Sequence, residues 1–70
     1  MKSNFVDFVK DYSKKEGNSG YEFVFKTHAA IYWIGLNKGK ELELLKRAKE
    51  KNLELNVTCD AITREIIDVV

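Results

Sequence analysis

The side chains best suited to acid–base or nucleophilic chemistry in this sequence are those of His28, its only histidine, and Cys59, its only cysteine. A histidine can act as a general base near neutral pH, and a cysteine can act as a nucleophile once deprotonated. His28 lies at a predicted chain reversal, where a histidine tolerates unusual backbone angles. Cys59 ends a predicted strand on its apolar side, where free cysteines are commonly buried. We therefore expect no catalytic residue and predict that the protein is not an enzyme.

Metal and cofactor sites are not predicted either. A zinc site normally needs four ligands gathered in close pairs, which one histidine and one distant cysteine cannot supply. The glycines are too scattered for a phosphate-binding loop, and no Ser-His-Asp arrangement can be assembled around this histidine. The sequence therefore gives no sign of a metal, a cofactor or a small-molecule substrate.

The strongest indication of a binding site is the apolar stretch from Ile31 to Leu36, which contains the only tryptophan. If this stretch is a strand, Ile31 and Trp33 lie on the side opposite the core, beside Val24 of the preceding strand. An open sheet face with a central tryptophan is typical of an interaction surface. We predict a partner-binding site formed by Trp33, Ile31, Val24 and Lys26. An alternative, in which Trp33 points into the core, stays open.

These observations favour a non-catalytic protein-interaction module, a small regulator or inhibitor in the style of those encoded by phages and mobile elements. It would bind a protein partner, or a second copy as a homodimer, through an apolar sheet face or edge. An alternative is a single-stranded nucleic-acid-binding protein that stacks bases on Trp33, with Lys26, Lys38 and Lys40 as phosphate contacts. Twelve basic and eleven acidic residues leave a net charge of +1, which argues against binding driven by phosphate.

Another pattern resembles, in outline, the core of the GIY-YIG nucleases. It comprises Gly20-Tyr21, then Tyr32-Trp33-Ile34-Gly35, then a helix that carries Arg47. In that family the two tyrosine motifs lie on a hairpin, the next helix brings an arginine, and a later glutamate binds a metal. The resemblance assigns the last two roles to Arg47 and Glu65. Here the first motif reads Gly-Tyr-Glu, the second has an inserted tryptophan, and Glu65 falls on a predicted strand rather than a helix.

The length of 70 residues indicates one domain, covering residues 1–70. A domain of this size buries only about 60% of the surface of its unfolded chain, so oligomerisation or partner binding would stabilise it. The longest apolar run, residues 29–36, is far shorter than the roughly 20 residues that span a bilayer. Because there is no signal-peptide pattern and only one thiol, we expect a cytoplasmic protein with no membrane contact.

Two helices are predicted from apolar spacing. In residues 4–16, Phe5, Phe8, Val9 and Tyr12 fall at positions i, i+3, i+4 and i+7, which places them on one helical stripe. Residues 40–51 form the second helix, whose opposite-charge pairs Glu43/Arg47 and Lys46/Glu50 suit a solvated face. Asn52 is placed to take the left-handed conformation that ends this helix.

Four strands are predicted from alternation of apolar and polar residues, over 21–26, 31–36, 53–59 and 66–70. A reversal at His28 and Ala29 would pair Phe25 with Tyr32, Phe23 with Ile34 and Tyr21 with Leu36. A turn that begins at Asp60 and closes with a left-handed Arg64 would join the last two strands. The alternatives are a short helix over residues 28–36 and a C-terminal helix from Ala61.

The predicted fold is therefore α+β, with helix-hairpin-helix-hairpin order (αββαββ). The simplest packing is a mostly antiparallel four-stranded sheet with both helices on one face, because each helix has one apolar stripe to bury. That face carries Phe23, Phe25, Tyr32, Ile34, Leu53, Leu55 and Val57. The open face presents Val24, Ile31 and Trp33 beside Asn56 and Thr58.

Overall fold

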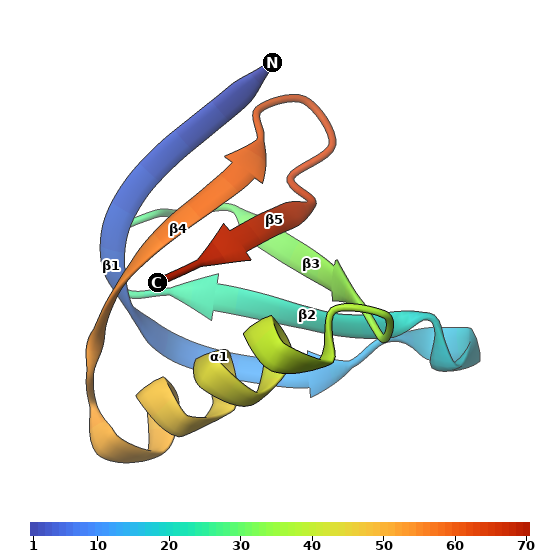
Figure 1. Ribbon diagram of the computed structural model, residues 1–70, viewed down its shortest axis with the longest axis horizontal. Coiled ribbons are helices and arrows are strands. Elements are labelled where there is room, and N and C mark those ends of the chain that lie inside the picture. Colours follow the sequence, from blue (N-terminus) through green and yellow to red (C-terminus); the bar gives the residue numbers. More distant parts are fainter.

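The computed structural model describes residues 1–70, apart from the side chain of Asn18. It contains one helix and five strands in the order βββαββ, with a short 3-10 turn after the first strand (Figure 1). The bounds are β1 Lys2–Lys14, the 3-10 turn Glu16–Asn18, β2 Gly20–Phe25, β3 Ile31–Gly35, α1 Gly39–Lys51, β4 Glu54–Asp60 and β5 Ile66–Val69. The predicted αββαββ fold with two helices and a four-stranded sheet is therefore wrong.

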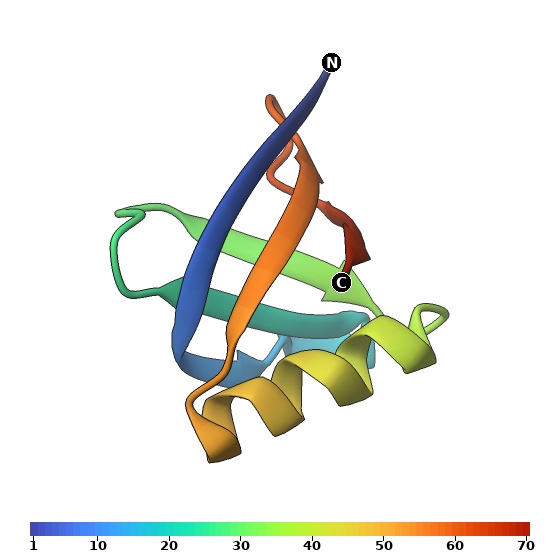
Figure 2. The same ribbon diagram turned by 60° about the vertical axis from the view of Figure 1, so that its left-hand side comes forward.

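The strands form one antiparallel sheet in the order β3-β2-β1-β4-β5. The long strand β1 pairs with two neighbours: Lys2 to Phe8 lie opposite β4, and Val9 to Lys14 lie opposite β2. It bends between these two halves, as Figures 1 and 2 show, so that the sheet curls around the core. The edge strands β3 and β5 then meet at a parallel bridge between Trp33 and Glu65.

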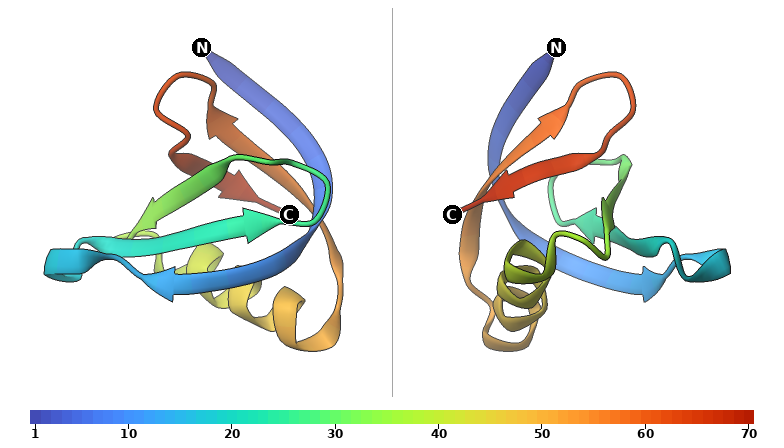
Figure 3. Two further views of the ribbon diagram at one scale, coloured as in Figure 1. Left: turned by 180° about the vertical axis from the view of Figure 1, so that it is seen from behind. Right: turned by 45° about the vertical axis from the view of Figure 1, so that its right-hand side comes forward.

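The result is a five-stranded, partly open barrel with α1 lying across one end, clearest in Figures 2 and 3. A partly open five-stranded barrel of this kind, with antiparallel pairs and a crossover in the strand order, is the architecture of the OB-fold. The helix connects β3 to β4 and buries Leu42, Leu45 and Ala48 against the barrel. The architecture alone does not assign a function.

The first predicted helix, over residues 4–16, is wrong, because most of this segment belongs to strand β1. Its apolar spacing is also compatible with a strand that contains a bulge. Phe5, Asp7 and Val9 alternate on the inner side of the strand, and a β-bulge between Val9 and Asp11 then shifts the alternation by one residue. Tyr12 consequently points inward as well. The bulge thus places Phe5, Val9 and Tyr12 on one side at the i, i+4 and i+7 positions of a helix, whereas Phe8, at i+3, lies on the outer side of the strand.

The β2–β3 hairpin forms as predicted, but its register differs. Phe23 lies opposite Tyr32, and Tyr21 lies opposite Ile34. The predicted pairs Phe25/Tyr32, Phe23/Ile34 and Tyr21/Leu36 are wrong because the loop spans residues 26–30 rather than two residues at His28 and Ala29. The register moved by two residues, so the residues within the two strands remained on their predicted faces, whereas Leu36 lies beyond the end of β3 and is 49% exposed.

The second half of the chain follows the sequence closely. Helix α1 ends at Asn52, whose φ of 55° and ψ of 52° are the expected left-handed conformation. Asp60 accepts hydrogen bonds from the amides of Ile62 and Thr63, and Arg64 closes the turn with a φ of 67°. The alternatives of a helix over residues 28–36 and a C-terminal helix from Ala61 are both excluded.

The core lies inside the barrel and against α1. It consists of Val9, Phe23, Phe25, Tyr32, Ile34, Leu42, Leu45, Ala48, Leu55, Val57, Cys59, Ile66 and Val69. Six of the seven residues predicted to be covered are in this list; the exception is Leu53, which is 43% exposed at the end of α1.

Gly20 is required where β2 begins, because a Cβ atom there would lie 2.0 Å from the Ile34 carbonyl oxygen and φ is +148°. We expect Gly20→Ala to lower the free energy of unfolding by about 2 to 4 kcal/mol. Gly39→Ala, at the start of α1 with open space around the position, is the control and should be neutral or stabilising by up to about 1 kcal/mol. Urea denaturation measures both; equal stabilities would contradict this role of Gly20.

Candidate binding face

Six outward side chains of β1, β2 and β3 form a small grid on one face of the barrel. The ladder places Asp11 opposite Val24 and Val24 opposite Ile31, and in the next row Ser13 opposite Glu22 and Glu22 opposite Trp33. Cross-strand neighbours in a sheet lie about 5 Å apart, so the grid is one continuous surface. Its apolar corner is Val24, Ile31 and Trp33, and we call these three residues the apolar corner below.

Trp33 is held between two loops. Its amide donates to the Arg64 carbonyl oxygen at 3.1 Å, and its indole Nε1–H donates to the Thr63 carbonyl oxygen at 3.0 Å. The Lys15 ammonium lies 4.5 Å from the centroid of the indole ring, within cation–π range. Trp33 is therefore a half-buried, fixed part of the surface rather than a core residue or a freely exposed ring.

Ile31 is the most accessible apolar residue of this face, with 59% of its surface exposed, and the neighbouring Val24 is half-buried. A shallow hollow of about 130 Å³ runs between them and β1; it is lined by Asp11, Tyr12, Ser13, Glu22, Val24 and Ile31. Among the described side chains, neither Asp11 nor Glu22 forms an ion pair. The face thus combines an apolar corner with two unpaired carboxylates.

The structure brings together three of the four predicted partner-binding residues. Val24, Ile31 and Trp33 are neighbours, whereas Lys26 lies at the end of the barrel near the end of α1. Its Nζ donates to the Asn52 side-chain oxygen at 3.0 Å and lies 5.3 Å from the Phe8 ring centroid.

The predicted four-stranded sheet placed Asn56 and Thr58 beside the apolar corner, and this prediction is wrong. They belong to β4, which is separated from β2 by the bent strand β1. Thr58 instead accepts a hydrogen bond from the Asn4 side chain at 3.0 Å. The predicted open face is therefore divided into two surfaces that point in different directions.

A buried polar cluster, which was not predicted, fixes the β2–β3 loop to β1. Asp7 is only 2% exposed, and its carboxylate accepts hydrogen bonds from the Phe8 and Thr27 amides at 2.7 and 2.9 Å and from the Thr27 hydroxyl at 2.7 Å. The His28 Nδ1 lies 2.6 Å from the same carboxylate, and its ring stacks on Phe5 with centroids 4.2 Å apart. If residues 2–14 had been predicted as a strand, the alternation of side chains along it would have placed Asp7 on the inner side.

The cluster controls the pKa of Asp7. Burial alone would raise this pKa, but the hydrogen bonds from His28, Thr27 and the two amides stabilise the carboxylate and lower it from 3.8 to about 2. The arrangement ties the loop to β1 and makes His28 part of a structural contact.

The other candidate catalytic residues lie apart from one another. Cys59 is 2% exposed, and burial raises the pKa of its thiol, which keeps it protonated and unreactive. Of the residues in the nuclease resemblance, Tyr32 is in the core, Glu65 is next to Trp33 in the bridge, and Arg47 lines a cleft beside α1. Within the described residues, no group of three or more His, Cys, Asp or Glu side chains is placed to hold a metal ion.

The predicted opposite-charge pairs of α1, Glu43/Arg47 and Lys46/Glu50, are not within ion-pair distance among the described side chains. Lys46 instead lies 4.3 Å from the Tyr21 ring centroid. The charged groups of α1 are thus left for solvent or for another molecule. The helix is also too short and too polar to cross a membrane.

No protein-family model matches this chain, and the comparisons with curated proteins and with solved structures likewise give no match. The site must therefore be interpreted from its own geometry.

The Asp7 cluster predicts an acid-sensitive fold. Because the pKa of Asp7 is lower in the folded than in the unfolded protein, its ionisation stabilises the fold above pH 3.8, and this stabilisation is lost as the pH falls toward 2. We expect the loss to be about 2 kcal/mol, and we expect Asp7→Asn to remove this part of the pH dependence. Urea denaturation at a series of pH values measures it. Asp11→Asn, an exposed carboxylate of the same strand, should retain the acid limb; its loss there would contradict the assignment.

Proposed function

We propose that this protein is a non-catalytic protein-binding module, a small regulator or inhibitor that contacts its partner through the apolar corner of Val24, Ile31 and Trp33. The observation that carries the proposal is Ile31, an aliphatic residue 59% exposed at the start of the edge strand β3, with Val24 opposite it on β2 and Trp33 two residues along β3. Contiguous apolar surface of this kind on a small domain is typical of interaction sites.

The rigidity of the face supports the same conclusion. Trp33 is fixed by two hydrogen bonds and one cation–π contact, so little side-chain freedom would be lost when a partner binds. In addition, OB-fold barrels commonly bind their ligands on the β2–β3 face, between the β1–β2 and β4–β5 loops. Here residues of both loops contact Trp33, Lys15 over the face of the indole ring and Thr63 at its N–H.

Single-stranded nucleic acid is the second candidate, favoured by the use of this same barrel face for oligonucleotides in OB-folds. Three features weigh against it. Asp11 and Glu22 would repel phosphate, one side of the Trp33 ring is covered by Lys15, and Lys26 and Lys38 already donate within the protein. A protein partner is favoured because an apolar centre with charged neighbours suits it better.

The compartment we propose is the cytoplasm. Cys59 is a free, buried thiol, which suits a reducing environment. The partner of the apolar corner is either a different protein or a second copy of this chain, and the two are separated by the mass in solution.

We expect Ile31→Asp to abolish the complex that the wild-type protein forms, with a loss of about 2 kcal/mol or more in binding free energy, because a carboxylate would be placed in the apolar contact. The matched control is Val6→Asp, which changes a 49% exposed apolar residue on the other outer surface of β1. Light scattering detects self-association, and capture from the lysate of the source cell detects a different protein. Identical masses and identical captured proteins for wild type and Ile31→Asp would refute the proposal.

The single tryptophan allows a direct test of the second candidate. We expect the emission of Trp33 to stay unchanged when single-stranded oligothymidylate is added at low salt. Quenching that weakens steeply as salt is added would instead favour nucleic-acid binding, because phosphate contacts release counterions. The variant Lys15→Ala is informative in that case, since it uncovers the ring and removes a cation from the face.

A further inference from the structure

The hollow beside the apolar corner is the concave part of the candidate binding face. Its volume is about 130 Å³, well below the roughly 300 to 1,000 Å³ of pockets that hold a whole small molecule. A hollow of this size accommodates the end of one side chain. Among the described residues its lining contains two acidic side chains, Asp11 and Glu22, and no basic one.

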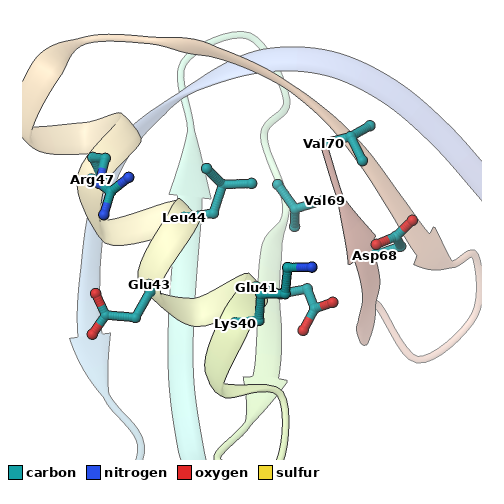
Figure 4. Close-up of a pocket in the computed structure, with 8 residues that line it drawn as sticks. All are labelled: Lys40, Glu41, Glu43, Leu44, Arg47, Asp68, Val69 and Val70. Atoms are coloured by element: carbon teal, nitrogen blue, oxygen red, sulfur yellow. The ribbon is translucent and has the colours of Figure 1, made fainter.

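The larger cleft between α1 and β5 has no such preference for one sign of charge. Its volume is about 550 Å³, and its lining combines the cations Lys40 and Arg47 with the carboxylates Glu41, Glu43 and Asp68 (Figure 4). This mixture of charges favours neither a cation nor an anion. The hollow on the β2–β3 face, in contrast, favours a cation.

The two carboxylates of the hollow are spaced so that one cation can contact both. Asp11 lies opposite Val24 and Ser13 lies opposite Glu22, so Asp11 and Glu22 are diagonal neighbours on β1 and β2. Diagonal neighbours of an antiparallel pair are about 7 to 8 Å apart, and a charged group between them is within reach of both side chains. The Tyr12 amide donates to Asp11 Oδ1 at 2.9 Å, which orients this carboxylate.

The lysines close to the hollow in the sequence do not neutralise these carboxylates. Lys10 and Lys14 belong to β1 and Lys15 follows it, but none of the three lines the hollow. The Lys15 ammonium lies over the Trp33 ring instead, and no lysine is within ion-pair distance of a carboxylate among the described side chains. The hollow therefore keeps two negative charges that a partner can pair.

The apolar wall of the hollow suits the aliphatic part of a long basic side chain. Val24 and Ile31 lie opposite each other on β2 and β3, and both line the hollow. Long basic side chains pack their methylene groups on apolar surface while the charged end stays in a polar environment. The guanidinium of arginine has five N–H donors in a planar fork, so it can bond to carboxylates on two sides. The lining is thus complementary to an arginine, a residue that is enriched at protein interfaces.

We propose that the partner of this face is a different protein that inserts an arginine side chain into the hollow. The guanidinium pairs with Asp11 and Glu22, and the methylene groups pack on Val24 and Ile31. This inference rests on the proposed function and adds the chemistry by which the partner is recognised.

A second copy of this chain is less well suited to the hollow. A symmetric dimer through this face would bring Asp11 and Glu22 of both copies together, and like charges facing each other in an interface cost free energy. The chain has two arginines. The Arg64 guanidinium lies 5.9 Å from the Tyr32 ring of its own chain. Arg47 is on α1, so its insertion would give head-to-tail rings or filaments rather than a closed dimer.

Two blocked tripeptides test the charge of the occupant. One has arginine between two leucines, and the other has citrulline, which matches arginine in length but carries no charge. In an NMR titration of the intact protein, the arginine tripeptide should shift the amide signals of Glu22, Val24 and Ile31 until they saturate. The citrulline tripeptide should bind about tenfold more weakly or worse, because the charge-assisted hydrogen bonds are lost. Equal affinities for the two tripeptides, or no shifts with the arginine tripeptide, would overturn the inference.

Two substitutions that preserve side-chain shape identify the carboxylates. Asp11→Asn and Glu22→Gln should each weaken binding of the arginine tripeptide by about threefold to tenfold. The matched control is Glu43→Gln, which removes an exposed carboxylate of α1 outside the hollow and should leave the affinity unchanged. Urea denaturation checks that the variants are folded. Wild-type affinity in both Asp11→Asn and Glu22→Gln would refute the assignment of the hollow.

The complex with the native partner separates this inference from the proposed function. We expect the complex to be lost in Ile31→Asp and to weaken by about tenfold or more in the double variant Asp11→Asn/Glu22→Gln. Loss in Ile31→Asp with an unchanged complex in the double variant would leave the apolar corner as the binding site and overturn the arginine. An unchanged complex in Ile31→Asp would refute the proposed function, and this inference with it.

Discussion

The pairing of one long strand with two different neighbours is the constraint on which the rest of this structure depends. β1 pairs with β4 along its first half and with β2 along its second, and the bulge between Val9 and Asp11 lies at the change of partner. A bulge increases the local twist and bends the strand, which allows a single sheet to curl into a barrel. Asp7, just before this bend, ties β1 to the loop that joins β2 and β3. The buried carboxylate therefore ties β1 to the β2–β3 hairpin, and the outer sides of these three strands form the candidate binding face.

The candidate binding face depends on the way the barrel closes. Where β3 and β5 meet, Trp33 is clamped between the loops around Lys15 and Arg64, and the apolar corner becomes a fixed surface. Beyond that bridge the two strands are no longer paired, so the end of β5 retains a free edge. Helix α1 packs against the end of β5, with a cleft between them. Incomplete closure thus leaves the apolar corner on one face of the barrel and this cleft beside the helix.

The second half of the fold could be predicted from sequence because its signals are local. The αL residue Asn52, the alternation from Glu54 to Asp60 and the Asp60 turn each depend on neighbouring residues only. β1 could not be predicted in the same way. Its bulge gives the apolar residues a helical spacing, and its inward Asp7 is stabilised only by Thr27 and His28, which are distant in the sequence. Local patterns therefore failed where tertiary contacts decide the conformation.

The apolar corner was predictable for a different reason. A register shift by an odd number of residues moves every side chain of a strand to the other face, and a shift by an even number does not. The β2–β3 register differed from the prediction by two residues. Val24, Ile31 and Trp33 therefore kept their outward face although their partners changed. Lys26 lies beyond the end of β2, so alternation could not place it, and its position depends on the contact with Asn52 at the end of α1. The outward face of a residue within a hairpin can thus be predicted from parity, whereas the position of a residue beyond the strand ends depends on contacts with distant parts of the chain.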